Sequence, residues 1–260
     1  MTGHWDCYAH IGAHRNVAAR DLLAAMDGSG IAHATLVPFL NAPGFDDLLA
    51  AARNCPARFR AVCRVDAAAM RAGQVEADAL LERGFSGARV ALPAPEPRSD
   101  ALEPLLRALD VQEKVLLVHA PDGIGPHAEQ LCAWAERYPR LRVFVPHLGW
   151  PRTSEGAPTP GWPEALRALA NCPRVFMGLS ALYYYSRQAF PFADTVECVQ
   201  AALEVFGPAY CVLAGDYPLT LERCTYAQVW ESLAAAVGDP VALAQMWDET
   251  PLHLWGEEVA

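Results

Sequence analysis

Short apolar runs alternate with longer segments of helical period from one end of the chain to the other. The apolar runs are rich in β-branched residues, whereas the segments between them repeat apolar positions every three or four residues. The predicted strands cover residues 4–10, 32–38, 60–66, 86–92, 114–120, 142–148, 174–180 and 210–216. The predicted helices cover residues 16–27, 45–54, 67–83, 100–110, 126–138, 162–171, 194–206, 223–237 and 240–256. This alternation is typical of repeated βα units.

Eight strands, each followed by a helix, predict an α/β fold of the (β/α)8 TIM-barrel class in one domain spanning residues 1–260. An open doubly wound sheet usually has fewer strands, about five to seven. The second predicted strand, 32–38, has the least regular pattern. Two irregular stretches, 152–162 and 183–193, follow predicted strand ends, where loops over the mouth of a barrel belong.

Polar residues and glycines at the ends of the predicted helices fit their usual roles. An N-cap side chain accepts from a free backbone N–H, and a glycine just past the last turn adopts the left-handed conformation that closes a helix. The predicted N-caps are Asn16, Ser99 and Asp194, and the predicted closing glycines are Gly28, Gly84 and Gly207.

The chain has a formal net charge of −10 and an isoelectric point near 5.2. A negative surface repels phosphate backbones, so nucleic acid is not an expected partner. An anionic small molecule is compatible with this charge, because a few arginines inside a cleft of low dielectric outweigh a diffuse surface charge. No apolar segment approaches the length that spans a bilayer, so no membrane partner is expected.

Eight cysteines are scattered along the chain without a C-x-x-C pair, at positions 7, 55, 63, 132, 172, 198, 211 and 224. Several lie inside apolar runs, so they are predicted to be small buried hydrophobic residues in a reducing compartment. The first residues lack the charged and apolar regions of a signal peptide. A cytoplasmic location is therefore expected.

Four predicted strands end in an ionisable side chain, namely His10, His119, His147 and Asp216. In a TIM barrel these ends meet at the face that carries the active site. A single histidine at a strand end often serves only a structural hydrogen bond. Burying each such group costs about 1–3 kcal/mol unless it is compensated, so four at equivalent positions favour a catalytic cluster.

The first predicted strand alternates polar and apolar residues. A period of two places His4, Asp6, Tyr8 and His10 on one face, which is predicted to point into the barrel. Tyr8 and His10 lie nearest the end of the strand, so they are expected at the mouth.

Two arginines, Arg64 and Arg89, lie within otherwise apolar strands. A guanidinium in such a place needs an anionic partner, and a carboxylate that accepts two hydrogen bonds fits it best. One interpretation is that either arginine, or both, holds a substrate carboxylate. The other is an internal ion pair, for example between Arg64 and Asp66.

Five motifs in family order make the chain similar to the amidohydrolase superfamily. It resembles the amidohydrolase-related branch (amidohydrolase 2) that holds 2-pyrone-4,6-dicarboxylate lactonase and several aromatic-acid decarboxylases. The motifs are residues 6–10 (DCYAH), 84–89 (GFSGAR), 116–119 (LLVH), 146–151 (PHLGWP) and 214–218 (AGDYP). The resemblance covers nearly the whole chain.

The first of these motifs departs from the family pattern D-x-H-x-H, because Tyr8 stands where the family has its first metal-ligand histidine. Tyrosine, with an ordinary pKa near 10, is a poorer ligand at neutral pH than imidazole. His10, His119 and Asp216 remain as a possible ligand set for one Zn²⁺ or Mn²⁺ with water in the open position. The resemblance also includes metal-independent lactonases, so we expect no required metal, with a metal-bound site as the alternative.

The expected reaction is hydrolysis of a lactone, or a similar activated carbonyl, of a small carboxylate-bearing substrate. Asp216 is expected to act as general base towards water, while His119 and His147 polarise the carbonyl. The residues expected to orient water or substrate, or to hold its carboxylate, are His10, Tyr8, Arg89, Arg64 and Tyr217.

Two other functions are compatible with the same residues. The resemblance allows a metal-dependent, non-oxidative decarboxylase of an aromatic or unsaturated acid. A barrel that binds a small acid without catalysis is disfavoured, because it would have no reason to retain four costly buried polar groups.

Aromatic residues gather in the segments after two predicted strands, at Trp150, Trp162, Tyr183, Tyr184, Tyr185 and Phe190. They predict either an aromatic-walled mouth for a flat ring or loops packed onto the barrel. Exposed aromatics there would also suit the interface of a homodimer.

Overall fold

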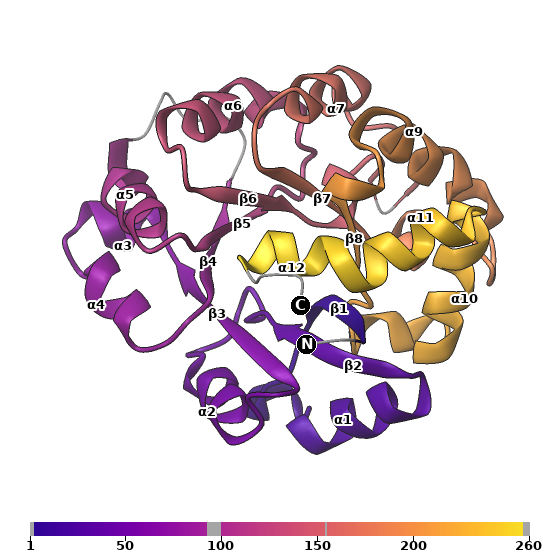
Figure 1. Cartoon of the computed structure of the whole chain (residues 1–260), viewed down its shortest axis with the longest axis horizontal. Helices are drawn as coiled ribbons and strands as arrows, with labels where there is room; N and C mark the ends of the chain where they lie inside the picture. The colour runs from indigo at the N-terminus through magenta and orange to yellow at the C-terminus, as the bar shows by residue number, and fades with distance from the viewer. Residues whose placement is uncertain (1–2, 93–99, 154, 257–260) are drawn as a thin grey trace.

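Eight parallel strands form a nearly closed barrel inside a ring of helices (Figure 1). The computed structural model describes residues 3–92, 100–153 and 155–256. The strands are β1 (His4–Ala9), β2 (Ile31–Leu36), β3 (Phe59–Val65), β4 (Gly87–Ala91), β5 (Val115–His119), β6 (Arg142–Val145), β7 (Val175–Leu179) and β8 (Cys211–Leu213). Each strand pairs with the next in chain order. The predicted (β/α)8 TIM barrel is confirmed, including the second strand.

The helices lie outside the strands. Their bounds are α1 (Ala19–Gly28), α2 (Asp46–Asn54), α3 (Ala67–Arg71), α4 (Ala77–Glu82), α5 (Glu103–Val111), α6 (Ala128–Arg137), α7 (Trp162–Ala170), α8 (Leu182–Tyr185), α9 (Val196–Phe206), α10 (Tyr226–Val237), α11 (Pro240–Ala244) and α12 (Thr250–Trp255). The predicted helix at 67–83 is divided into α3 and α4, with a left-handed Gly73 between them. The last predicted helix, 240–256, runs through a π-helical turn at Gln245–Glu249 between α11 and α12.

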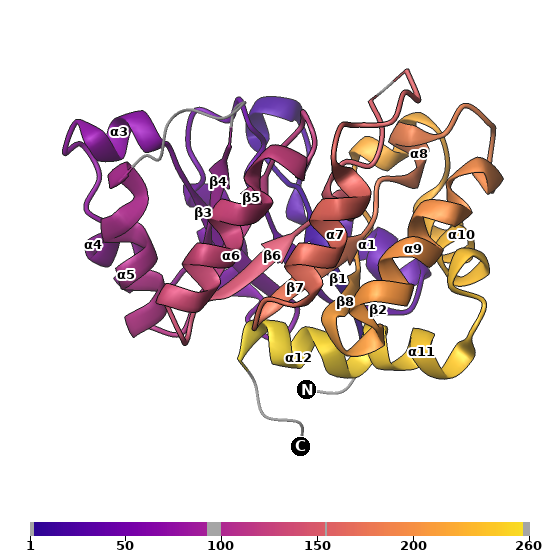
Figure 2. The same cartoon turned by 90° about the horizontal axis from the view of Figure 1, so that it is seen from above.

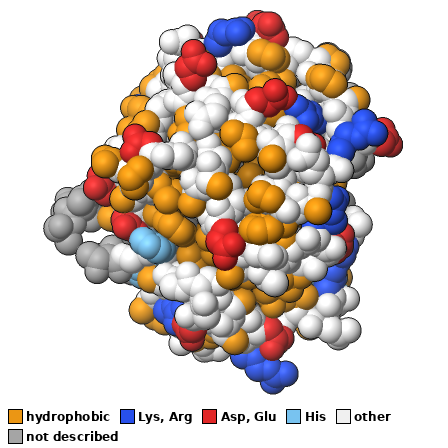
Figure 3. All heavy atoms as spheres, turned by 90° about the vertical axis from the view of Figure 1, so that its right-hand side faces the viewer, with side chains coloured by type: hydrophobic (Ala, Val, Ile, Leu, Met, Phe, Trp, Pro, Cys, Tyr) orange, Lys and Arg blue, Asp and Glu red, His pale blue; other side chains and the backbone are white. Residues whose placement is uncertain are grey.

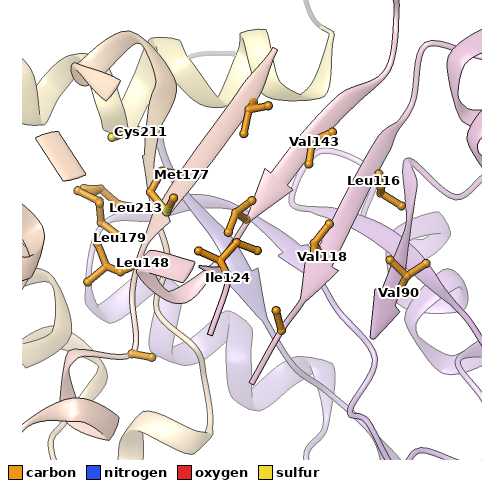
Figure 4. Packing of buried hydrophobic residues seen from close by; sticks show 14 of the residues in the cluster. Val90, Leu116, Val118, Ile124, Val143, Leu148, Met177, Leu179, Cys211 and Leu213 are labelled. Carbon is orange, nitrogen blue, oxygen red and sulfur yellow. The ribbon is translucent and has the colours of Figure 1, made fainter. Parts of the chain in front are cut away.

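Two layers of apolar side chains stabilise this arrangement. The outer layer joins the outward faces of the strands to the helices, and Figure 4 shows residues such as Val90, Leu116 and Leu179 in it. A smaller inner layer fills the barrel with Trp5, Cys7, Val62, Val115, Leu117, Phe144, Phe176 and Val212. The barrel is therefore a packed core rather than a pore.

One end of the barrel is closed by the C-terminal helices. Leu252, Leu254 and Trp255 of α12 belong to the inner apolar layer. Figure 2 shows α11 and α12 lying across the end from which the strands start, with α3 and α8 at the opposite end. The carboxyl ends of the strands therefore lie at the end of the barrel that α11 and α12 do not cover.

The first and last strands are joined at this open end. An isolated parallel bridge links Ala9 to Tyr217, and the backbone N–H of Asp216 donates to the Tyr8 carbonyl at 2.9 Å. Between the strands lies the buried carboxylate of Asp6. It accepts from the backbone N–H groups of Tyr8 (3.0 Å) and Gly215 (2.8 Å) and from the Tyr226 hydroxyl (2.8 Å). Burial raises the pKa of Asp6 to about 7 despite these three donors.

This contact corrects the predicted facing of the first strand. Trp5 and Cys7 fill the barrel interior, whereas Asp6 bonds to α10 outside it and His4 pairs with the part-exposed Asp248. The pairing of β1 with β2 is irregular between Asp6 and Ala9, and this bulge restores Tyr8 to the interior. The prediction that His4 and Asp6 point into the barrel is wrong.

Several predicted helix ends differ as well. Asn16 adopts a left-handed conformation before α1, which starts after Ala18, so it is not the N-cap. Asp194 does not cap α9 but accepts from Ser186 Oγ and the Arg187 N–H. Ser99 lies outside the described residues. Gly84 and Gly207 have the expected positive φ after their helices, whereas Gly28 is the last residue of α1 and Gly30 is left-handed instead.

Two of the cysteines are paired. Cys132 of α6 and Cys172, just after α7, form a disulfide that joins the two helices. The prediction that all eight cysteines are free thiols is wrong for this pair, which lies 40 residues apart in sequence. A cytoplasmic location, which was inferred partly from reduced cysteines, stays a prediction.

Figure 3 shows the side of the molecule that lies at the right of Figure 1, where acidic and basic side chains are scattered among apolar ones. Among the described residues, no helix is long and apolar enough to cross a membrane.

We expect Asp6→Ala to lower the free energy of unfolding by about 3–5 kcal/mol, because it leaves three buried donors without an acceptor. Tyr226→Phe removes only one of the three hydrogen bonds and should cost about 1 kcal/mol. Urea unfolding of both variants measures these losses. Equal, small losses would contradict the role of Asp6 as the bond between the first and last strands.

Candidate active site

A cavity of about 300 Å³ opens at the carboxyl ends of the strands. It brings together six residues predicted from the sequence, namely Tyr8, His10, Arg89, His119, His147 and Asp216. Other residues that line it include Arg15, Phe39, Leu40, Asn41, Trp150, Tyr183, Tyr184 and Tyr185. The aromatic wall predicted at the mouth is therefore partly present, while Tyr185 is also packed into the core.

Asp216 follows β8 in a left-handed conformation, with φ of 54°. It follows Gly215, where a Cβ would lie 2.6 Å from Asp6 Oδ2, so only glycine fits there. The Tyr183 hydroxyl donates to Asp216 Oδ2 at 2.6 Å. The other oxygen, Oδ1, lies 3.4 Å from His10 Nε2 and is buried without a hydrogen-bond partner among the described residues. One carboxylate oxygen is thus held and the other is left free.

The pKa of Asp216 lies below its ordinary value. Burial acts to raise it, but the neighbouring His147 and His10 and the hydrogen bond from Tyr183 together outweigh burial. Asp216 is therefore an ionised carboxylate at neutral pH.

His119 has its two ring nitrogens in different environments. Arg89 Nη2 donates to His119 Nδ1 at 2.9 Å. A guanidinium has only donors, so Nδ1 is the lone-pair nitrogen and the hydrogen of neutral His119 lies on Nε2. Burial lowers the pKa of His119 to about 2, aided by the charge of Arg89. Nε2 is buried without a partner among the described residues, which makes it a free donor.

Arg89 is 3% exposed, and Nη1 donates to the Pro38 carbonyl. No carboxylate among the described residues lies within 4.0 Å of its guanidinium, so the predicted internal ion pair is not seen there. Burial lowers the pKa of Arg89. A buried cation without a carboxylate partner is costly, and an anionic ligand in the cavity would offset that cost.

His10 is oriented by the strand next to its own. Its Nδ1 donates to the Val37 carbonyl at 2.6 Å, which leaves Nε2 facing Asp216. The ring stacks on Phe39, with centroids 4.4 Å apart, and the Arg15 guanidinium lies 4.9 Å from the centroid of the Phe39 ring.

Tyr8 contributes a phenol to the same cavity. Its ring meets those of His10 and His147 edge-on, at centroid distances of 5.0 and 4.5 Å. Burial raises the pKa of Tyr8, so the hydroxyl keeps its proton at neutral pH. That hydroxyl is buried without a partner among the described residues.

His147 begins a turn in which four consecutive residues, His147 to Trp150, have positive φ. The segment after β7 holds it in this strained conformation. Ser180 Oγ accepts from the His147 backbone N–H at 3.1 Å and lies 2.8 Å from Nδ1, and the Tyr185 hydroxyl donates to the His147 carbonyl at 2.7 Å. Burial lowers the pKa of His147 to about 4, so its ring is neutral at neutral pH.

The arrangement does not fit a divalent metal. In a metal-ligating histidine the ring nitrogen that faces the ion is unprotonated, whereas Arg89 keeps the hydrogen of His119 on Nε2. Tyr8 offers a protonated phenol. Among the side chains that the structure describes, no group of three His, Cys, Asp or Glu residues is placed to hold a metal ion. His10, His119 and Asp216 thus do not form the ligand set considered from the sequence.

Two predicted substrate-binding residues lie outside the cavity. Arg64 donates to the carbonyls of Phe39, Leu40 and Ala42, so it orders the loop after β2. Tyr217 packs edge-on against Tyr226 in the outer apolar layer, although its carbonyl accepts from the His10 N–H. The structure does not bring either side chain to the site.

Two polar contacts were not anticipated from the sequence, namely those of Ser180 with His147 and of Tyr183 with Asp216. Their only signal was position, because Ser180 is the last residue of the seventh predicted strand and Tyr183 lies three residues beyond it. Nothing in the pattern indicated which catalytic group each hydroxyl would meet.

The family model described as amidohydrolase matches residues 13–256. The L-fucono-1,5-lactonase of Burkholderia ambifaria is 32% identical over 97 residues, which cover 36% of this chain and 32% of the lactonase. That of Burkholderia multivorans is 27% identical over 150 residues, covering 52% of this chain and 46% of the lactonase. The matched part spans about a third to a half of the length of these relatives.

A solved structure shows the same fold over the whole chain. The probable 2-pyrone-4,6-dicarboxylic acid hydrolase of Acinetobacter baumannii, determined with citric acid bound, has a TM-score of 0.79 and 19% identity. The match covers 98% of this chain and 99% of that one.

The low pKa values of the histidines predict how stability depends on pH. Folded His119 and His147 have pKa values of about 2 and 4, below the value near 6.5 of an unfolded histidine. The stability that these two neutral histidines allow is fully present above pH ~6.5. The free energy of unfolding falls as the pH drops below that value, because the unfolded chain binds protons that the folded histidines do not. Each group contributes a slope of about 1.4 kcal/mol per pH unit.

We therefore expect His119→Gln to lose stability less steeply than the unsubstituted protein between about pH 6 and pH 4, by about 1.4 kcal/mol per unit. His253→Gln, at an exposed helix position, is the matched control for the substitution itself. Urea unfolding at several pH values provides the slopes. Parallel slopes for His119→Gln and the unsubstituted protein would show that His119 is not held neutral by the fold.

Proposed function

Because the chain belongs to the amidohydrolase family, we propose that it hydrolyses a lactone, or a similarly activated ester, of a small carboxylate-bearing molecule. One observation carries the proposal. The ionised Asp216 Oδ1 and the neutral His119 Nε2–H are both buried, both lack a partner among the described residues, and belong to side chains that line one cavity. A base and a hydrogen-bond donor are what hydrolysis of an ester carbonyl needs.

In the first step Asp216 Oδ1 takes a proton from a water molecule as the water oxygen bonds to the carbonyl carbon. His119 Nε2–H and the Tyr8 hydroxyl donate to the carbonyl oxygen while it gains negative charge. His10 Nε2, which lies beside Asp216 Oδ1, orients the water. When the tetrahedral intermediate collapses, the ring C–O bond breaks and protonated Asp216 returns the proton to the leaving alkoxide. The product carries one new carboxyl group and one new hydroxyl group.

Arg89 supports the assignment of a carboxylate to the substrate, since its buried charge has no carboxylate partner among the described residues. Arg15 provides a second cation at the mouth of the cavity, and it too forms no ion pair within the described chain. The relative from Acinetobacter baumannii was determined with citric acid, itself a carboxylate. We place the substrate carboxylate between these two arginines.

The proposed reaction requires no metal. In metal-dependent hydrolases the ion polarises the carbonyl, and here the N–H of His119 and the O–H of Tyr8 supply that polarisation. The same donor set disfavours the decarboxylase alternative, which in the resembling branch uses a bound divalent ion.

Asp216→Asn is expected to lower kcat for lactone opening by about 10²–10⁴-fold, because an amide cannot accept the proton of water. Suitable probes are 2-pyrone-4,6-dicarboxylate and L-fucono-1,5-lactone, with ring opening followed by absorbance or by acid release. Tyr183→Phe keeps the base but removes a hydrogen bond to its charged form, so the acid limb of kcat/KM should move to higher pH. Full activity of Asp216→Asn on a substrate that the unsubstituted protein opens would refute the role of Asp216.

Arg15→Gln is expected to raise KM for 2-pyrone-4,6-dicarboxylate several-fold with little change in kcat, because an exposed charge contributes about 1 kcal/mol to binding alone. Arg20→Gln is the matched control, since Arg20 is exposed on α1 and does not line the cavity. Steady-state kinetics of the two variants separate the effects. The same KM in both would mean that Arg15 does not bind the substrate.

A further inference from the structure

Ser180 follows β7 and is fully buried behind the cavity. Its Oγ accepts a hydrogen bond from the His147 backbone N–H at 3.1 Å and lies 2.8 Å from His147 Nδ1. A backbone carbonyl sets the tautomer of His10, and the Arg89 guanidinium sets that of His119. At His147 the group beside Nδ1 is the Ser180 hydroxyl.

The single hydrogen of the Ser180 hydroxyl decides whether Ser180 or His147 Nδ1 is the donor in the hydrogen bond between them. A hydroxyl has one hydrogen to donate and two sites that accept. The His147 backbone N–H occupies one accepting site, and no other acceptor for the Ser180 hydrogen lies within hydrogen-bonding distance among the described residues. The hydrogen is satisfied only if it is donated to Nδ1. The reverse direction would leave a buried O–H without an acceptor, at a cost of about 1–3 kcal/mol.

The His147 ring lines the cavity, so the ring nitrogen that carries its hydrogen affects the reaction. His119 and His147 both meet the Trp150 indole edge-on, each with its centroid 4.7 Å from that of Trp150, at 88° and 86°. The two imidazoles thus flank one aromatic side chain in the lining of the same cavity.

We propose that Ser180 is a positioning residue that holds His147 as the Nε2–H tautomer, so that the cavity has a second imidazole N–H donor beside that of His119. The inference rests on the proposed lactone hydrolysis. Arg89 and Ser180 then act alike, since each donates to Nδ1 of one histidine and leaves its Nε2–H for the developing oxyanion. Without Ser180, His147 would also present a lone pair on Nε2, which repels that oxyanion.

The direct test is the ¹⁵N chemical shifts of the imidazole nitrogens in histidine-labelled protein at neutral pH, with the His147 signals identified by their loss in His147→Gln. We expect a protonated Nε2 and an unprotonated Nδ1 for His147. This measurement needs no substrate, so it stands even if the proposed reaction is wrong. A protonated Nδ1 in the unsubstituted protein would overturn the inference, whatever the activity.

The functional test uses Ser180→Ala and its conservative partner Ser180→Thr. Ser180→Ala should populate the Nδ1–H tautomer and lower kcat about 10–100-fold with KM little changed, because the lost donor acts on the transition state. Ser180→Thr keeps a hydroxyl and should restore both the tautomer and most of kcat.

Ser232→Ala is the matched control, because Ser232 is a buried serine whose hydroxyl donates to the Val229 carbonyl of its own helix and bonds to no other side chain that the structure describes. It should leave the His147 shifts and kcat unchanged. An unchanged tautomer and kcat in folded Ser180→Ala would overturn the inference. If the unsubstituted protein opens no lactone, the proposed function fails, and the shifts alone then decide the tautomer.

Discussion

The Asp6 carboxylate, buried between the first and last strands, is the contact on which the rest of the site depends. It accepts from two backbone N–H groups, those of Tyr8 on β1 and of Gly215 after β8. One carboxylate therefore sets the backbone just before two functional side chains, Tyr8 and Asp216. The Tyr226 hydroxyl ties the same carboxylate to α10. A barrel closed in this way brings residues about 200 positions apart in the chain to one cavity.

Within that cavity Asp216, His119 and His10 each have one polar atom that is hydrogen-bonded to the protein and another that faces the cavity. Tyr183 holds Oδ2 of Asp216, Arg89 holds Nδ1 of His119, and Val37 accepts from Nδ1 of His10. The atoms left over are an acceptor on Asp216 and donors on His119 and Tyr8. Burial keeps His119 and His147 neutral, while the neighbouring histidines and the hydrogen bond from Tyr183 keep Asp216 charged. Groups fixed in this way need little reorganisation when charge develops on a substrate.

The sequence predicted the barrel and the four ionisable strand ends because both follow from periodicity, which depends on neighbours along the chain. It misplaced Asp6 because a bulge between Asp6 and Ala9 changes the phase of β1, and bulges leave no mark in a pattern of period two. The prediction that Arg64 binds the substrate was wrong, because its guanidinium donates to carbonyls of the loop after β2 and does not face the cavity. The pairing of Cys132 with Cys172 and the contacts of Ser180 and Tyr183 depend on tertiary packing, which local spacing does not encode.

The most direct test of the account is the rate of lactone opening by protein whose metal content is known. Protein purified with a chelator would be assayed on the two lactones, and its zinc and manganese would be measured by elemental mass spectrometry. The account predicts that protein with far less than one equivalent of metal opens the lactone as fast as protein purified without a chelator. The reason is that His119 and Tyr8 donate to the carbonyl oxygen that a metal ion would otherwise polarise. A rate lost with the metal and restored by added Zn²⁺ or Mn²⁺ would contradict it.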